Sequence, residues 1–286
     1  MDVNTLYKDL MFSVLRIVVT NEDGSGDTGT SLLVDLESEL GKLTPVLITN
    51  KHVIQNAIEI SIQLPMSEGP KGVILGDTVD IKITLEGDRF FSPPDCDVDI
   101  AIIPFGAILR DLMIQDPNRK PFVRVLPVSE FPSDEEYASL DALEEVFFMG
   151  FPDGRRDSLN KTPIIRRGIT ATPATLHFDG RPEFLIDASV FPGSSGSPLF
   201  VKRTTMFQDK SKLVTQQLAI FVGIVTLSHH RTTRVPVLAL EIDIDESLDL
   251  GVVTNVAAIK DALNKFCEYA NLPKPRFRTS PLGASE

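Results

Sequence analysis

Short apolar segments separated by turn residues recur along most of this chain, and they limit the fold that it can adopt. Two of them, Ala57–Leu64 and Val79–Leu85, alternate apolar and polar residues at a period of two, which is typical of half-buried β-strands. Short strands at this spacing favour a sandwich or a barrel over alternating strands and helices. The other strands that we expect are Ser13–Val19, Thr30–Asp35, Pro45–Thr49, Asp99–Ile103, Glu145–Gly150, Ile164–Pro173, Phe184–Ser189, Ser197–Lys202, Gln217–Leu227 and Val235–Asp243.

The two series of strands are separated by a segment of a different kind. Residues 106–143 contain a predicted short helix, Gly106–Met113, and an acidic stretch, Ser133–Glu136, that can begin another. We interpret this segment as a connection between an N-terminal β-barrel at 1–105 and a C-terminal β-barrel at 144–253.

The spacing of the apolar residues changes near the end of the chain. Thr254–Leu263 has apolar residues at helical spacing, with Thr254 as the expected N-cap, which predicts a C-terminal helix at 254–272. The segment 273–286 is rich in Pro, Ser, Arg and Gly and is expected to be a disordered tail.

The charge and hydropathy of the chain exclude two classes of partner. With 28 basic and 40 acidic residues, the formal net charge is −12, which argues against nucleic acid and against an anionic membrane surface. No run approaches the roughly 18 apolar residues that a transmembrane helix needs. Met1–Asn4 lacks the basic start of a signal peptide. We therefore expect a cytoplasmic protein, unless a leader was removed before residue 1.

Cysteine and histidine usage gives no sign of a metal site or of a disulfide framework. Cys96 falls in an expected loop and Cys267 in the expected helix, so both are predicted to be free thiols in a reducing compartment. The four histidines and two cysteines do not have metal-ligand spacing, and no Gly-rich phosphate loop is present. No metal and no cofactor are therefore expected.

The segment Phe191–Leu199, with the sequence Phe-Pro-Gly-Ser-Ser-Gly-Ser-Pro-Leu, is suited to hold a nucleophile. Its glycines allow a tight turn directly before an expected strand. The amides of Gly193 and Ser195 can then point at one spot, as an oxyanion hole requires. Such a turn on its own is also common as an ordinary Gly/Ser loop.

Histidine and aspartate candidates lie beside two earlier strands. His52 follows an apolar strand, where it can face a cleft and exchange protons near neutral pH. Asp99 directly precedes an Ile-Ala-Ile-Ile run, and for this reason it is preferred to Asp97 as the carboxylate that orients the histidine. Together with Ser195 these residues occur in the order His, Asp, Ser, which is the chymotrypsin order.

Three segments resemble those that carry the triad in HtrA/Deg-type trypsin-like proteases. Asp187–Leu199 resembles their nucleophile segment, Ile48–Val53 their histidine segment and Asp99–Ile102 their aspartate segment. Further segments that match them, or chymotrypsin-like proteases generally, are Val146–Pro152, Gly168–Ala171, Val222–Ser228 and Gly251–Val256.

The resemblance implies a fold and an activity. The fold is all-β, with two antiparallel six-stranded β-barrels of the chymotrypsin-like kind and a C-terminal α-helix. The activity is that of a serine endopeptidase acting on polypeptide substrates, with Ser195 as nucleophile, His52 as general base and Asp99 as the residue that orients it. Gly193, Ser194 and Ser195 would supply the amides of the oxyanion hole. The residues implied for substrate binding are Ser189, Val190, Phe191, Thr226, Leu227, Ser228 and Gly251.

The chain departs from the family pattern in ways that bear on regulation. Ser197 stands where a second glycine is usual, so the turn is more crowded. Ser194 replaces the acid that pairs with a newly cut N-terminus in zymogens, so activation by that ion pair is not expected. We expect no PDZ domain after the predicted helix. A regulatory protein partner is one way in which such a protease could be restrained.

The expected S1 pocket carries no charge, so an unpaired Lys or Arg of the substrate would be costly to bury there. Val190 matches the position that lines a small apolar pocket in HtrA-like enzymes, which implies small or medium aliphatic residues at P1. The long loop expected at Lys202–Gln216, and His229 and His230 after the substrate strand, could fold into the cleft. We interpret the two histidines as a solvated strand end, and His177 as a surface residue.

Two alternatives use the same residues differently. A catalytically silent peptide-binding or regulatory module would keep the fold, although all three triad positions are filled. An α/β-hydrolase esterase would need a helix directly after Ser195 and a histidine last in chain order. Pro198–Val201 is expected to be a strand instead.

Overall fold

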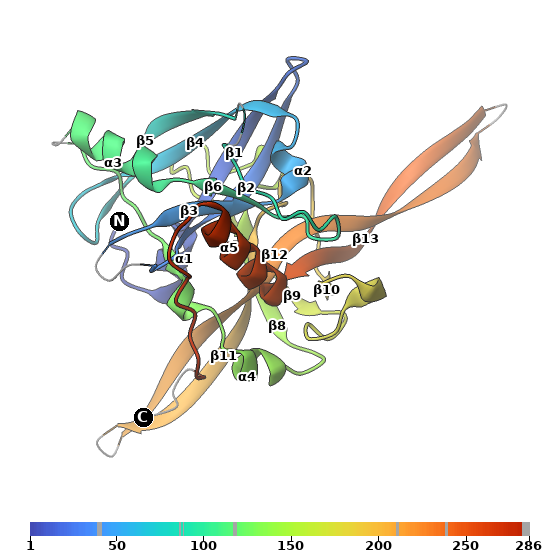
Figure 1. Ribbon diagram of the computed structural model, residues 1–286. Helices are drawn as coiled ribbons and strands as arrows, with labels where there is room; N and C mark the ends of the chain where they lie inside the picture. Colours follow the sequence, from blue (N-terminus) through green and yellow to red (C-terminus); the bar gives the residue numbers. More distant parts are fainter. Residues whose placement is uncertain are drawn as a thin grey trace.

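The first half of the chain forms one sheet in the computed structural model, which describes residues 1–38, 42–85, 87, 89–116, 119–209, 212–237 and 240–281 (Figure 1). The strands lie in the order β5, β4, β1, β2, β3, β6, with β7 parallel to β2. Ile60, Ile62 and Leu64 of β4 are buried at alternate positions, as the period of two predicts. The strands are β1 Val14–Asn21, β2 Gly26–Asp35, β3 Pro45–Thr49, β4 Ala57–Ser67, β5 Val73–Thr84, β6 Ala101–Pro104 and β7 Leu126–Pro127.

The described pairing of this sheet does not close, so the prediction of two closed six-stranded barrels is not confirmed for the N-terminal half. β6 has only four residues, and on the edge away from β3 it makes one isolated bridge, from Ile102 to Phe91. The segment before it contains Pro93 and Pro94, and proline has no N–H to donate to a ladder. The loop that carries Asp99 therefore remains outside the sheet.

The second half forms a closed barrel, and here the prediction is confirmed. The strands follow the order β10, β13, β12, β11, β8, β9, and β9 pairs again with β10. Phe148, Phe184 and Val222 are among the side chains that fill the interior. The strands are β8 Glu145–Gly150, β9 Ile164–Thr170, β10 Glu183–Asp187, β11 Pro198–Asp209, β12 Lys212–Val237 and β13 Leu240–Asn255.

Two long hairpins project from this barrel in opposite directions and correct two predictions (Figure 1). Most of Lys202–Gln216, expected as a loop, lies in the paired arms of β11 and β12. The expected strand Val235–Asp243 is instead the far end of the β12–β13 hairpin, and residues 238 and 239 lie outside the described part. Threonines in both hairpins favour extended backbone, but the polar residues between them hide the strand pattern.

The C-terminal helix α5 (Val256–Tyr269) packs into a cluster of apolar side chains drawn from both halves. Ile259, Leu263 and Phe266 are its main buried residues. Its N-cap is Asn255, whose side chain accepts the Ala258 N–H at 2.9 Å, and not the predicted Thr254. Thr254 lies one residue before the cap position, and its hydroxyl lies 2.9 Å from that of Thr226 instead.

The connection between the halves contains the two predicted helices. They are α3 (Gly106–Gln115) and α4 (Asp134–Ala138), and α4 begins after Ser133, whose hydroxyl accepts the Glu136 N–H at 3.1 Å. The remaining short elements are α1 Leu6–Met11, α2 Lys51–Ile54 and the 3-10 turns η1 Val128–Glu130, η2 Pro152–Gly154 and η3 Phe178–Gly180. None of the helices in the described part of the chain is long and apolar enough to span a membrane.

The part of the expected tail that the structure describes, 273–281, packs against the rest of the protein. Phe277 lies against Phe131, and Arg278 forms an ion pair with Glu136, whose side chain is almost fully buried. These contacts explain why a segment of disorder-like composition is packed. Residues 282–286 lie outside the described part.

Candidate active site

His52 is positioned by the end of β3 and by the single-turn helix α2. Val53 and Ile54 are buried and hold this turn against the sheet. His52 precedes them on the turn, and 35% of its side chain is exposed. The position just past β3 therefore leaves the imidazole partly exposed at the surface.

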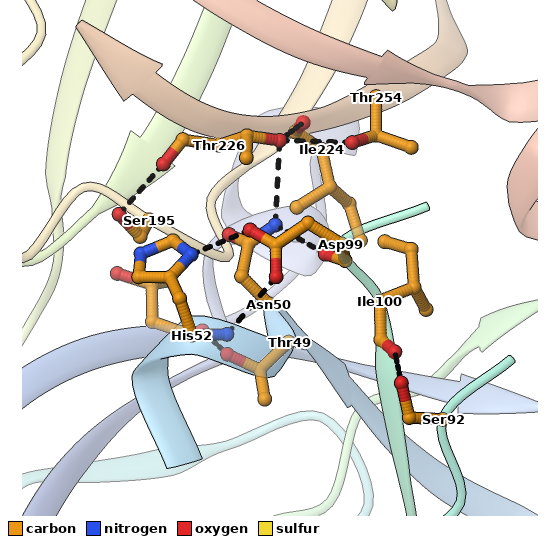
Figure 2. A network of polar contacts seen from close by, with 11 residues as sticks. Thr49, Asn50, His52, Ser92, Asp99, Ile100, Ser195, Ile224, Thr226 and Thr254 are labelled. Carbon is orange, nitrogen blue, oxygen red and sulfur yellow. Dashed lines mark hydrogen bonds and ion pairs between the residues drawn. The ribbon is translucent and has the colours of Figure 1, made fainter. Parts of the chain in front are cut away.

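Asp99 lies two residues before the first residue of β6 and contacts His52 at two points (Figure 2). Its Oδ2 is 2.5 Å from the His52 Nδ1, and its Oδ1 accepts the His52 backbone N–H at 2.9 Å. This pair of contacts fixes both the ring and the start of α2. Asp97 is not brought to the histidine, and instead pairs with Arg181 at the surface, at 3.7 Å.

The turn that carries Ser195 needs glycine at two places. Gly193 has φ of +83° and Gly196 has φ of +89°, which is a backbone region that favours glycine. A Cβ at Gly193 would lie 2.5 Å from the Phe151 carbonyl oxygen, and one at Gly196 would lie 1.8 Å from the Thr30 carbonyl oxygen. The Ser195 hydroxyl donates to the Thr226 carbonyl oxygen at 2.9 Å, and not to His52 (Figure 2).

Two backbone amides of this turn are free. The N–H groups of Gly193 and Ser195 have no hydrogen-bond partner in the part of the chain that the structure describes. The Ser194 N–H, by contrast, donates to the Phe191 carbonyl at 2.9 Å and is not available as the third predicted donor. The turn therefore offers two donors to an oxyanion, which is the usual number.

A buried polar network behind His52 and Asp99 joins the two halves of the protein (Figure 2). The Asn50 side-chain amide donates to the Asp99 carbonyl oxygen at 2.8 Å and to the Thr226 hydroxyl at 3.3 Å. The Thr226 hydroxyl also lies 2.9 Å from that of Thr254. The Thr226 hydroxyl is thereby linked through the Asn50 side chain to the backbone carbonyl of Asp99. Asn50 was missed because only its position before the histidine turn marks it in the sequence.

Comparison with protein families decides the broad class of this chain. A model of the trypsin-like peptidase domain matches residues 29–206, which is more than half of the chain and includes His52, Asp99 and Ser195. The chain belongs to the trypsin-like peptidase family. No curated protein matches it.

Three solved structures of proteases are similar to this trypsin-like peptidase. The HL collagenase is 13% identical, with 92% of this chain and 95% of that chain covered and a TM-score of 0.48. A protease from M. tuberculosis in its active form is 13% identical, with 96% and 86% covered and a TM-score of 0.46. A thermostable serine protease from an extremophilic microorganism is 9% identical, with 90% and 98% covered and a TM-score of 0.45.

The residues predicted to bind substrate in this peptidase lie in the segment before Ser195 and on β12 and β13. Ser228 pairs with Gly251 between β12 and β13, while Phe191 and Leu227 are exposed. Val190 is buried and packs under Gly251, where a Cβ would lie 2.6 Å from its Cγ2. Glycine at 251 therefore makes room for Val190 at the base of the expected pocket. The remaining two predicted residues are Ser189, which is half-buried, and Thr226, which is buried.

Histidines outside the site are placed mostly as expected. His177 is exposed, and His229 is exposed with its ring edge-on to Phe178, 6.4 Å between ring centroids. The side chain of His230 lies outside the described residues. The two cysteines are free thiols, Cys96 at the surface and Cys267 buried, and burial raises the pKa of Cys267 to about 11.

Acidic groups near Asp99 shape the local electrostatics. Burial raises the pKa of Glu183 above its usual range, Arg181 opposes this, and the negative charges of Asp99 and Asp97 add to it. Asp95, Cys96 and Asp97 lie close enough together to be considered as metal ligands, but all three are exposed on a loop. Nothing else at this loop points to a bound ion.

Proposed function

We propose that this trypsin-like peptidase is a serine endopeptidase that cleaves peptide bonds through an acyl-enzyme, with His52, Asp99 and Ser195 as its triad. The observation that carries the proposal is the double contact of Asp99 with His52, on the ring Nδ1 and on the backbone N–H. A carboxylate bonded to Nδ1 leaves Nε2 as the proton acceptor. The free amides of Gly193 and Ser195 support the same assignment.

Acylation begins with a rotation of the Ser195 side chain from the Thr226 carbonyl oxygen toward His52 Nε2. Rotamer changes of this kind take picoseconds to nanoseconds in accessible side chains. As Ser195 Oγ attacks the carbonyl carbon of the peptide, its proton passes to Nε2. The carbonyl oxygen becomes an oxyanion, which the Gly193 and Ser195 amides stabilise.

Release of the two products follows from the same groups. His52 gives its proton to the leaving amine, the C–N bond breaks, and an ester remains on Ser195. A water molecule then loses a proton to His52 and attacks the ester, and the proton returns to Ser195 as the acid product leaves. Asp99 stabilises the imidazolium in both stages. One water is consumed, and one carboxyl group and one amine are formed.

A fluorophosphonate probe tests the proposal on the intact chain. We expect the probe to label Ser195 without prior cleavage, because Ser194 offers no carboxylate for an N-terminal ion pair and the turn is already formed. Peptide mapping locates the label, and Ser195→Ala serves as the unlabelled control.

Two outcomes would count against this proposal. Labelling only after N-terminal trimming would contradict the expected constitutive competence. Absence of label under all conditions would favour a silent peptide-binding module, which the bond from the Ser195 hydroxyl to the Thr226 carbonyl would suit.

The specificity pocket gives a second expected result. Val190 packs against Gly251 and neither residue carries a charge, so small or medium aliphatic P1 residues should be preferred. A positional-scanning peptide library measures this preference. Strong selection for Arg or Lys at P1 would mean that an acid from elsewhere reaches the pocket.

A further inference from the structure

Thr30 of β2 touches the Ser195 turn from the opposite half of the protein. It is fully buried, and all of its polar groups are hydrogen-bonded. Its backbone N–H donates to the Ser195 carbonyl at 2.8 Å, and its hydroxyl donates to the Gly193 carbonyl at 2.9 Å. The hydroxyl also accepts the Phe151 N–H at 3.1 Å, and the Thr30 carbonyl accepts the Thr49 hydroxyl at 2.7 Å.

The hydrogen bonds of the turn account for the direction of its two free amides. In a trans peptide the N–H and the C=O point to opposite sides. A hydrogen bond to the carbonyl oxygen therefore also fixes the direction of the N–H of the same peptide unit. The Pro192 carbonyl accepts the Asp153 N–H at 2.6 Å and thereby aims the Gly193 N–H. The Ser194 carbonyl accepts the Ser197 N–H at 3.0 Å and thereby aims the Ser195 N–H.

The peptide unit between these two donors is the one that Thr30 holds. Its carbonyl, of Gly193, accepts the Thr30 hydroxyl, and its N–H, of Ser194, donates to the Phe191 carbonyl. A rotation of this unit would change the angle between the two free amides. The fit is also tight, because a Cβ at Gly196 would lie 1.8 Å from the Thr30 carbonyl oxygen.

No acidic side chain supports the turn at the neighbouring position. Ser194 is buried, and its hydroxyl has no hydrogen-bond partner among the described residues. Among the described residues, the turn is instead bonded to Thr30, to the Asp153 N–H and to the backbone of Val225 in β12. Of these, only Thr30 bonds to the peptide between Gly193 and Ser194.

We propose that Thr30 is a positioning residue for the oxyanion site, and that its hydroxyl holds the Gly193–Ser194 peptide so that the two flanking amides converge. This inference rests on the proposed function of Ser195. The N-terminal half thereby supplies a support for the turn, in addition to the candidate general base His52 and the aspartate that orients it, Asp99.

Thr30→Val tests the proposal, because valine keeps the shape of threonine and removes the hydroxyl. We expect kcat for a peptide substrate to fall about tenfold to a hundredfold with little change in KM, since the loss arises in the transition state. Inhibition by a peptide aldehyde, whose hemiacetal oxygen occupies the oxyanion site, should weaken by a similar factor. Thr30→Ser, which retains the hydroxyl, should restore both values.

Thr49→Val is the matched control, because it removes a buried hydroxyl that packs beside Gly196 but whose hydrogen bond goes to the Thr30 carbonyl and not to the turn. Melting temperatures of both variants separate stability from turnover. Where Thr30→Val does not fold, Thr30→Ala removes the hydroxyl without a methyl group beside the Gly193 carbonyl, and the same loss of kcat is expected.

If the folded variant that lacks the Thr30 hydroxyl keeps the kcat and the aldehyde inhibition of the wild-type protein, the role of Thr30 is overturned. The proposed function would not be affected by that result. Equal losses of kcat in the Thr30 and Thr49 variants would assign Thr30 to general stability and also overturn it. A wild-type protein that neither cleaves peptides nor labels with a phosphonate would instead reject the proposed function, and with it this inference.

Discussion

Asp99→Asn should lower the turnover of a peptide substrate by about ten-thousandfold, by analogy with the loss seen when the triad aspartate is amidated in a related fold. The Asp99 carboxylate accepts from the His52 ring and from its backbone N–H. The side-chain amide that the substitution introduces at position 99 has one oxygen, which can still accept the His52 backbone N–H. Its NH₂ group would then face the Nδ1–H of the ring, donor against donor. The imidazole therefore moves its proton from Nδ1 to Nε2. Nε2 would then carry a proton and could not accept one from Ser195. A continuous peptidase assay on the purified variant measures the loss.

Asp97→Asn is the matched control for this prediction. Asp97 lies two residues away in the same loop, and its contact is an exposed ion pair with Arg181, which is worth little. Turnover should therefore stay near the wild-type value. Near-normal turnover of Asp99→Asn together with loss in Asp97→Asn would show that the wrong aspartate has been assigned. Double variants that also lack His52 or Ser195 should lose little more than the single ones, because the three residues act as a unit.

The residues of the candidate site could be located from the sequence because each lies in a short local pattern. His52 follows an apolar strand, Asp99 precedes one, and Ser195 stands between glycines. Such patterns depend on neighbours in the chain and need no knowledge of the tertiary fold. The alternation of apolar residues in β4 likewise gave both the strand and its buried face.

What the sequence could not supply are contacts between residues far apart in the chain. The bonds of Thr30 to Gly193 and of Asn50 to Thr226 cross from one half to the other, and no local pattern marks them. The open edge of the N-terminal sheet depends on how the loop before β6 packs. The outer arms of the β11–β12 hairpin, within Lys202–Gln216, were missed because they lack the apolar alternation of a half-buried strand, whereas the strands at its base were predicted.

Gly150→Ala should destabilise the protein by about 2–3 kcal/mol and lower turnover by about a hundredfold. Gly150 ends β8 directly behind the Ser195 turn. A Cβ there would lie 1.9 Å from the Ser197 Oγ and 2.9 Å from the Thr30 Oγ1. Ser197 is fully buried, so its side chain cannot turn out into solvent, and we expect the turn itself to shift. Chemical denaturation and the peptidase assay measure the two effects.

The second substitution Ser197→Gly should rescue much of both losses. Ser197 stands where trypsin-like proteases usually have a glycine, and its hydroxyl has no partner among the described residues, so its removal alone should cost little. In the double variant the Cβ at 150 takes the space that the serine leaves, and the two changes should therefore be strongly non-additive. Gly106→Ala, whose Cβ would meet only Pro45 at 3.3 Å, is the control and should be close to neutral. A double variant no better than Gly150→Ala alone would show that Ser197 is not what requires glycine at 150, and the crowding of this turn would need another cause.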